Sequence, residues 1–426
     1  MTGFERRAHL RKEKTMIGRI KPLSLFRFLV VVTAGVLMIS CGPKAQQPLS
    51  QLDTPEHHTF TGIRLLNQEK FVDAGREFEL ALRLDPGYAK AHVGIGLVKA
   101  YQNDFTGGLD SLKQAEKHTR SDPEKVFVRV GFIRVNTLSH SACLRIGVEC
   151  KPDDAWLKYS KDAFDQAVLI DPKAAAAHYF MGEAYLTALD LDQAGRMFSR
   201  VLDLNGEYVK EADGRWKLVQ KIQRAMPGTL TGKKIALVER VTRADVAALF
   251  LEELKIDVLY LRRTPKSFDT AFKDPEKAKS TTVGRTSAAD IGSHPLRADI
   301  EAMIRIGMRG LEVYPDGNFR PDERVDRATY AMMIEDILIK ISGDNALATR
   351  FIGSPSPFPD LRADLPYFNA VMVVTSRGLM EARDMTSGAF SPLEPVGGAD
   401  ALLVIRKMRE ELRYMGYLLD SSAPKM

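Results

Sequence analysis

The residues with the most specific chemistry in this sequence of 426 are its three cysteines and eight histidines. Cys143 and Cys150 could form a disulfide in an oxidising compartment. They are seven residues apart, so on one unbroken helix they would lie about 10 Å from each other, beyond disulfide reach. A bond therefore requires the helix to end between them, and Lys151-Pro152 just beyond is compatible with such an end. The sequence leaves the pairing open.

The histidines invite a metal-binding interpretation, which their surroundings do not favour. Those in question are His57, His58, His92, His140 and His178. No Cys/His/Asp cluster with the spacing of metal ligands accompanies them, so we expect packing or surface roles and no metal site. The run Asp316, Asn318 and Asp322 could suggest a calcium loop, but it lacks the loop's ligand spacing and terminal Glu and predicts a turn instead.

The motifs of common enzyme classes were sought and not found. There is no Gly-x-Ser-x-Gly turn, no His-Glu-x-x-His helix and no glycine-rich phosphate loop. We therefore expect a protein that is not an enzyme and binds no cofactor. An envelope hydrolase would need carboxylate pairs, and at this composition such pairs occur by chance.

Charge is concentrated at the N-terminus. The net charge is +6, and residues 1–40 hold eight Lys/Arg and two Glu, which accounts for all of it. The rest of the chain is neutral by count and lacks the basic surplus of nucleic-acid-binding proteins. We expect no nucleic-acid partner.

The same segment has the layout of a signal peptide, because basic residues precede an apolar run from Phe28 to Ile39 that is short for a membrane span. The following stretch, LMISCG, resembles a bacterial lipobox, which implies that Cys41 becomes the acylated first residue of the mature protein. This interpretation assigns 1–40 to the signal peptide, starting at Met1 or Met16, and 41–55 to a flexible tether. The alternative is a plain secretory signal with an incidental cysteine.

Residues 56–225 contain internal repeats. Phe164 and Phe198 are 34 residues apart, as are Phe78 and Leu112. Small residues at matching places let paired helices approach closely, while the phenylalanine fills the gap to the neighbouring helix. The small residues are Gly62, Gly96 and Gly182. The recurring positions are Ala74, Phe78, Ala81 and Pro86, then Ser160, Phe164, Ala167 and Pro172, then Ala194, Phe198, Val201 and Gly206.

This pattern resembles the tetratricopeptide repeat, which implies an α-solenoid with a concave groove that holds a protein partner. We expect four units. The third is the least regular, because the long stretch 122–149 replaces its normal first helix and makes this repeat extended or irregular. Residues 208–225 would cap the stack.

A different pattern follows, and its clearest copy is residues 289–340. Two segments at helical spacing flank the turn signal Pro315-Asp316-Gly317 and an N-cap at Asp326. This copy closely resembles the S-layer-homology repeat, with GLEVYPDGNFRPDERV and DRAT at the diagnostic places. A third copy can be aligned at 358–415 and a degenerate first copy at 226–261, which could begin near Gly214 and share its leading helix with the solenoid. Residues 262–288 form an exposed linker.

The second resemblance implies a helical module of three helix-loop-helix repeats around a pseudo-threefold axis, whose grooves bind cell-wall polysaccharide or another peptidoglycan-linked polymer. By the family motif, the polymer-binding residues are Thr242, Arg243, Asp245, Asp326 and Arg327. An arginine just after an N-cap lies beside free backbone N–H groups and the positive end of the helix, a favourable place for a carboxylate. The alternative is that these arginines are solvated or pair with nearby acids. The third copy has Gly397, Gly398 and Asp400 here and has lost its arginine.

Together the resemblances imply a mainly α protein, a tetratricopeptide solenoid followed by an S-layer-homology module, anchored to the membrane by lipid. It would act as an envelope scaffold that joins a protein partner to wall polymer. Gly42 is not the aspartate that retains lipoproteins, so the resemblance implies the outer membrane in an organism with two membranes. The alternative function is an assembly factor for an envelope export or secretion complex, in which both modules bind proteins.

Overall fold

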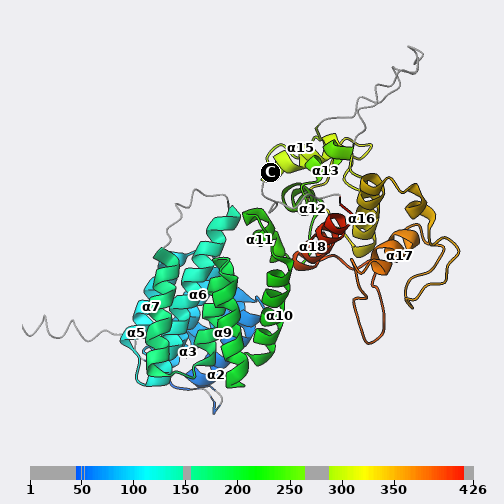
Figure 1. Cartoon of the computed structure of the whole chain (residues 1–426). Helices are drawn as coiled ribbons and strands as arrows, with labels where there is room; N and C mark the ends of the chain where they lie inside the picture. The colour runs from blue at the N-terminus through cyan, green and yellow to red at the C-terminus, as the bar shows by residue number, and fades with distance from the viewer. Residues whose placement is uncertain (1–44, 49, 52, 147–154, 264–286, 417–426) are drawn as a thin grey trace, which may run out of the picture. The chain divides into compact units, whose positions relative to one another are not determined.

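The computed structural model describes residues 45–48, 50–51, 53–146, 155–263 and 287–416, and these are helical with no strand among them (Figure 1). They divide into an N-terminal unit, residues 1–139, and a C-terminal unit, residues 140–426. The boundary lies inside the region 56–225 that we expected to form one solenoid. The predicted signal peptide, Cys41, Cys150, the side chain of Cys143 and most of the linker lie outside the described residues.

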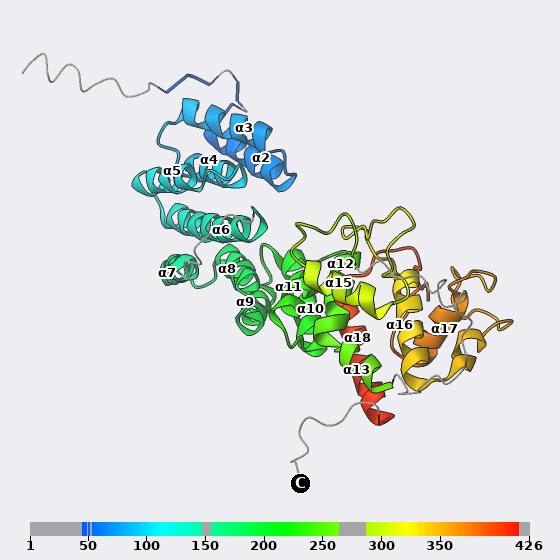
Figure 2. The same ribbon diagram turned by 90° about the horizontal axis from the view of Figure 1, so that it is seen from above.

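The N-terminal unit consists of helices that pack in chain order, α2 against α3, α3 against α4 and α4 against α5 (Figure 2). They are α2 (Pro55–Asn67), α3 (Phe71–Leu84), α4 (Ala89–Tyr101), α5 (Phe105–Lys117) and α6 (Asp122–Ile146), the last crossing into the C-terminal unit. Phe78 is fully buried, and a Cβ at Gly62 or Gly94 would lie 2.6 or 2.4 Å from its ring. The absence of a side chain at these glycines thus makes room for the phenylalanine, as predicted for Gly62.

The first helices of the C-terminal unit repeat this construction. They are α7 (Ala155–Ile170), α8 (Ala175–Thr187), α9 (Leu191–Leu204) and α10 (Val209–Ala225), packed in chain order. Phe198 is fully buried, and a Cβ at Gly182 would lie 2.7 Å from its ring. Phe164, expected to be an equivalent core residue, is only partly buried and has its ring 5.1 Å from that of His178.

The remaining helices of this unit surround one hydrophobic core whose largest buried rings include Phe250, Phe319, Tyr330, Phe368 and Phe390. They are α11 (Leu230–Ala236), α12 (Arg243–Ala248) with the π-helical turn η2 (Leu249–Glu253), α13 (Ile256–Arg263), α15 (Arg297–Ile306), α16 (Arg327–Ser342), the 3-10 turn η3 (Asn345–Thr349), α17 (Phe368–Ser376) and α18 (Gly398–Tyr414).

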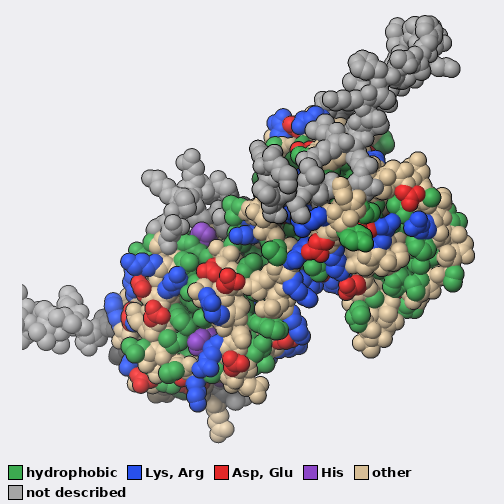
Figure 3. All heavy atoms as spheres, viewed as in Figure 1, with side chains coloured by type: hydrophobic (Ala, Val, Ile, Leu, Met, Phe, Trp, Pro, Cys, Tyr) green, Lys and Arg blue, Asp and Glu red, His purple; other side chains and the backbone are tan. Residues whose placement is uncertain are grey.

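Helix α10 connects the two halves of the C-terminal unit, because it packs on α9 and also on α18. Basic and acidic side chains gather together near the place where α10 and α18 adjoin (Figure 3). Helix α10 thus contacts both the repeat helices and α18, the last helix of the third copy.

Candidate functional site

Three valines join the starts of α12, α16 and α18 in a closed ring of backbone hydrogen bonds. The N–H of Val241 donates to the carbonyl of Val396 at 2.9 Å, that of Val396 to Val325 at 3.0 Å, and that of Val325 to Val241 at 3.0 Å. Each valine is at most 2% exposed. The ring creates three junctions, at each of which the start of one helix contacts a loop of another copy.

At the first junction, the start of α12 contacts the turn of the second copy. The Arg243 side chain is 6% exposed. Its guanidinium donates to three backbone carbonyls, those of Phe319 at 2.9 Å, Gly310 at 2.5 Å and Glu312 at 2.8 Å. It also lies 4.7 Å from the centre of the Phe319 ring and 4.8 Å from that of Tyr314. Arg243 thus holds the turn of the second copy in place.

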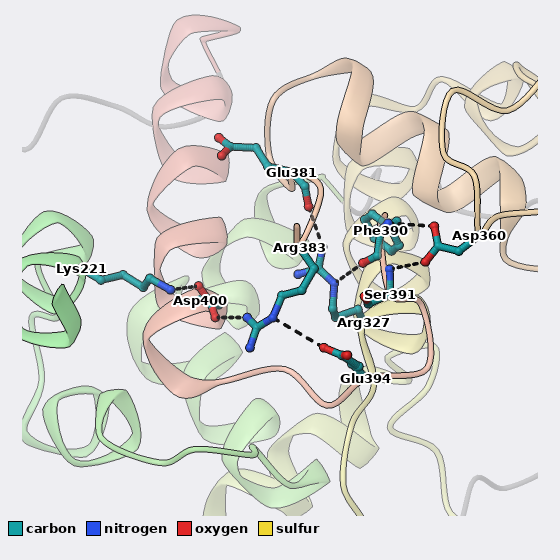
Figure 4. A network of polar contacts seen from close by, with 9 residues as sticks. All are labelled: Lys221, Arg327, Asp360, Glu381, Arg383, Phe390, Ser391, Glu394 and Asp400. Carbon is teal, nitrogen blue, oxygen red and sulfur yellow. Dashed lines mark hydrogen bonds and ion pairs between the residues drawn. The ribbon is translucent and has the colours of Figure 1, made fainter. Parts of the chain in front are cut away.

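The second junction repeats this arrangement between α16 and the turn of the third copy (Figure 4). Arg327 is 6% exposed and donates to the carbonyls of Phe390 at 2.8 Å and Glu381 at 2.6 Å. Its charge lies 4.4 Å from the centre of the Phe390 ring. Burial lowers the pKa of Arg327, because the charged form loses contact with water. The carbonyl oxygens and the ring replace part of that solvation.

Both turns are held by an aspartate as well. Asp290 accepts from the N–H groups of Phe319 and Arg320 at 2.8 and 2.7 Å, and Asp360 accepts from those of Phe390 and Ser391 at the same distances. The residue after each phenylalanine has φ 56°. The second and third copies therefore present the same turn to the arginine that enters it.

The third junction has no arginine, and the structure gives the reason. Gly398 donates its N–H to the carbonyl of Val238 at 2.8 Å, and a Cβ on it would lie 1.7 Å from the carbonyl oxygen of Ile235. Helix α11 occupies the place that a turn holds in the other copies. An arginine at the start of α18 would have no turn to enter, because the first copy lacks the usual turn. This accounts for the missing arginine of the third copy.

The structure gives the five expected polymer-binding residues internal partners. Thr242 and Asp245 form a reciprocal capping box at the start of α12, and Asp326 accepts from the N–H of Thr329 at 2.7 Å. Arg243 and Arg327 point at carbonyls of the next copy. The sequence left open that these two arginines are solvated or paired with nearby acids. In the structure they are instead buried and bonded to backbone carbonyls. These residues position the junctions and offer no free guanidinium to a ligand.

Sequence reasoning missed the polar groups that are exposed beside the junctions. Arg320 is 51% exposed, pairs with Asp316 at 3.0 Å and lies 4.2 Å from the centre of the Tyr314 ring. Arg383 is 45% exposed and bonds Asp400 at 3.1 Å. Counting from the aligned glycines, prolines and phenylalanines of the two turns would have placed both arginines near the junctions.

Asp400 also bonds Lys221 of α10 at 2.6 Å, so this carboxylate connects α18, the third turn and the last solenoid-like helix (Figure 4). Among the described residues there is no group of three or more His, Cys, Asp or Glu side chains arranged to hold a metal ion. In the same part of the chain, no helix combines the length and apolar composition needed to cross a bilayer.

Comparison with protein-family models gives a match to part of the chain. Residues 311–331 fit the family model of the S-layer homology domain. The matched segment runs from the turn held by Arg243 into the start of α16, so it contains one side of each of the first two junctions, the turn at the first and Arg327 at the second. No curated protein matches the chain.

Proposed function

We propose, from the S-layer homology match at 311–331, that this chain is a non-enzymatic cell-envelope protein that binds wall polymer beside its first two junctions. The match is the observation that carries the proposal, because it covers the turn that Arg243 enters. Thr242, Arg243, Asp245, Asp326 and Arg327 serve this binding by holding the helix starts and turns in register. The contacts with polymer fall to the exposed groups next to them.

The surface beside the first junction has the chemistry that an acidic sugar requires. Arg320 presents an exposed guanidinium, which binds carboxylates through paired hydrogen bonds. Tyr314 lies next to it, and its hydroxyl donates to Glu323 at 3.0 Å. Beside the second junction, Ser391 stands where Arg320 does, and the exposed Arg383 supplies a cation from another place in the third copy.

The other half of the proposal concerns a protein partner and the membrane. Helices α2–α5 and α7–α10 pack in chain order within their units, which supports a solenoid. The resemblance of 56–225 to tetratricopeptide repeats assigns a protein partner to its concave surface, and solenoids of this kind bind peptides without chemistry. Acylation of Cys41 would hold the protein to the membrane, and no cofactor is required.

Cosedimentation with purified cell walls tests the polymer half directly. The full chain should sediment with walls, and acid extraction of the secondary polymer should abolish this. Arg320→Ala should weaken sedimentation about tenfold, because each charge-assisted hydrogen bond contributes about 1.5–3 kcal/mol. Arg76→Ala is the matched control: Arg76 is 72% exposed on α3 and pairs with Asp73 at 3.1 Å, much as Arg320 pairs with Asp316.

Equal sedimentation of the parent chain with extracted and unextracted walls would contradict polymer binding. No sedimentation at all would favour the alternative, in which both modules bind proteins within an export or secretion complex. Arg320→Ala and Arg76→Ala should both keep the parent's circular dichroism, so that any loss reflects binding.

A further inference from the structure

A histidine lies between two carboxylates at the start of the N-terminal unit. The side chain of His58, on α2, is 15% exposed. Its ring nitrogen Nδ1 lies 2.7 Å from Oε2 of Glu77 on α3, and its other nitrogen, Nε2, lies 2.9 Å from Oδ1 of Asp53. Asp53 precedes α2 and belongs to the segment that follows Cys41 in the chain. The histidine thus joins this segment to the first pair of helices.

This arrangement requires a charged imidazole. An ionised carboxylate only accepts hydrogen bonds, and a neutral imidazole has one N–H group whereas the imidazolium has two. Both contacts of His58 are therefore satisfied only when the ring carries its extra proton. Burial acts to lower the pKa of His58, but the hydrogen bonds with Glu77 and Asp53 outweigh it, and the pKa is raised above its ordinary value of 6.5.

The other charged groups around His58 contact different partners or lie exposed. Helix α2 packs against α3 and α4, and on α2 itself the neighbouring ring is that of His57, 5.9 Å away between centres. On α3, Asp73 pairs with Arg76, while Glu79 and Arg83 are exposed. On α4, Lys90 lies 5.9 Å from the centre of the Phe127 ring, His92 bonds the carbonyl of Pro86, and Lys99 bonds the hydroxyl of Ser111. The charge state of His58 is therefore set by its two carboxylates.

The segment before α2 has a second contact with α3, since Gln46 donates its N–H to the carbonyl of Arg83 at 2.7 Å. Loss of the proton from His58 would leave one of the two carboxylates facing a ring nitrogen that has no hydrogen. Glu77 is held within α3, whereas Asp53 lies outside the helices. Asp53 is therefore the carboxylate that moves away, and the backbone bond of Gln46 is left to hold the segment alone.

We propose that His58 is a pH-sensitive latch, which holds Gln46 and Asp53 against α3 and α2 while the ring is protonated and releases them when the proton is lost. The two bonds are complete below about pH 6.5, the ordinary pKa of the side chain. They are lost as the pH rises through the higher pKa of the folded state. The segment is thus docked in acidic surroundings and free in alkaline ones.

The latch changes how far the folded chain can lie from the membrane, a consequence that rests on the proposed acylation of Cys41. At about 3.4 Å per residue, the chain from Cys41 to Gln46 can extend at most about 17 Å, and the chain from Cys41 to Thr54 about 44 Å. Release of the segment therefore gives the protein a longer reach from its anchor at alkaline pH.

Amide hydrogen exchange of the purified full chain tests the latch, with the exchange rate of the segment that holds Gln46 compared with the unprotected rate at each pH. Millisecond pulse labelling at about pH 6 and about pH 8.5 covers the range in which a raised histidine pKa titrates. His57→Gln is the matched control, because His57 is exposed and its ring has no hydrogen bond among the described residues. In Glu77→Gln, the new amide can donate to Nδ1 of a neutral ring while the N–H at Nε2 donates to Asp53, so the extra proton is no longer needed.

In the parent chain and in His57→Gln, protection of the segment should fall about tenfold or more between the two pH values, the effect of losing one charge-assisted hydrogen bond. Glu77→Gln should stay protected at both values, and His58→Leu should be poorly protected at both, with the circular dichroism of the parent. Constant protection in the parent, or a Glu77→Gln chain that responds to pH as the parent does, would overturn the latch. Neither lipid nor wall is present in this measurement, so its failure would leave the proposed function standing.

Discussion

At the scale of single residues, the direction in which an arginine points decides between a binding role and a structural one. The sequence places Arg243 and Arg327 correctly at helix starts after the N-caps Thr242 and Asp326. Their side chains turn toward carbonyls of a loop more than 50 residues further along the chain. The local sequence pattern predicts an N-cap, because a cap involves residues that are close in the chain. It does not predict a contact with a distant loop, which only the folded structure brings close.

Arg327→Ala should destabilise the C-terminal unit by about 3 kcal/mol. It removes two charge-assisted hydrogen bonds and leaves the carbonyl of the buried Phe390 without its partner. Urea unfolding measures the loss, and amide exchange of Val325 and Val396 should accelerate with it. Arg362→Ala is the control, because Arg362 is 78% exposed and pairs with Asp364, which is 63% exposed, so a change under about 0.5 kcal/mol is expected. Similar effects of the two variants would contradict the role given to Arg327.

Two glycine-to-alanine changes should have opposite signs. Gly398→Ala should cost about 2 kcal/mol or more, because its methyl group would overlap the carbonyl of Ile235, and relief requires α18 to move from α11. Gly214→Ala lies within α10 with free space around its Cβ and should stabilise the chain by about 0.5–1 kcal/mol through helix propensity. Thermal unfolding of both variants is the measurement, and a neutral Gly398→Ala would mean that α11 lies elsewhere.

At the scale of helices, spacing predicted some contacts well and others poorly. The pairing of Gly182 with Phe198 follows from sequence because both lie within one helical hairpin. The repeat that contains residues 122–149 was expected to be extended or irregular, and α6, at Asp122–Ile146, is one long helix of 25 residues. Residues 147–154, which include Cys150, lie outside the described residues, so the pairing of Cys143 with Cys150 stays a prediction. Helix α11 was not predicted. The sequence of the first copy was aligned with copies that have a turn at this place, and the first copy has a helix there instead.

Phe198→Ala should cost about 3–5 kcal/mol, since a fully buried ring is removed from between α8 and α9. Phe164→Ala should cost clearly less, because Phe164 is only partly buried. Urea unfolding of the two variants in the full chain compares them under identical conditions. A larger loss at position 164 than at 198 would show that the repeat register is misplaced.

At the scale of the molecule, the sequence predicted a mainly helical chain and located the segment that matches the S-layer homology family. It did not predict that α7–α10 belong to the same compact unit as the C-terminal helices, with the division at 139–140. That grouping depends on α10 packing against α18, and the residues involved are far apart in the chain. Polar groups contribute to it through the ion pair between Lys221 and Asp400 and the hydrogen bond from Arg406 to the carbonyl of Arg224.

Lipid attachment at Cys41 is a prediction about the whole molecule. The mature protein should begin at Cys41 and carry two or three acyl chains, because a single chain gives only weak, reversible membrane binding. Intact-mass analysis of membrane-extracted protein would reveal them. Cys41→Ala should be released from membranes by a salt wash, whereas Cys143→Ala, a cysteine change elsewhere, should remain bound. Retention of the Cys41→Ala form would argue against the anchor.

The ring of three valines has a consequence for the order in which the protein can fold. Val241 leaves the ribosome long before Val396, yet its N–H group has its ring partner only in that late residue. The bond between Val325 and Val241 can form once the second copy has been made, but a nascent chain that stops before residue 396 carries an open ring. Closure of the ring is accordingly a late step of folding, completed when the third copy joins the first.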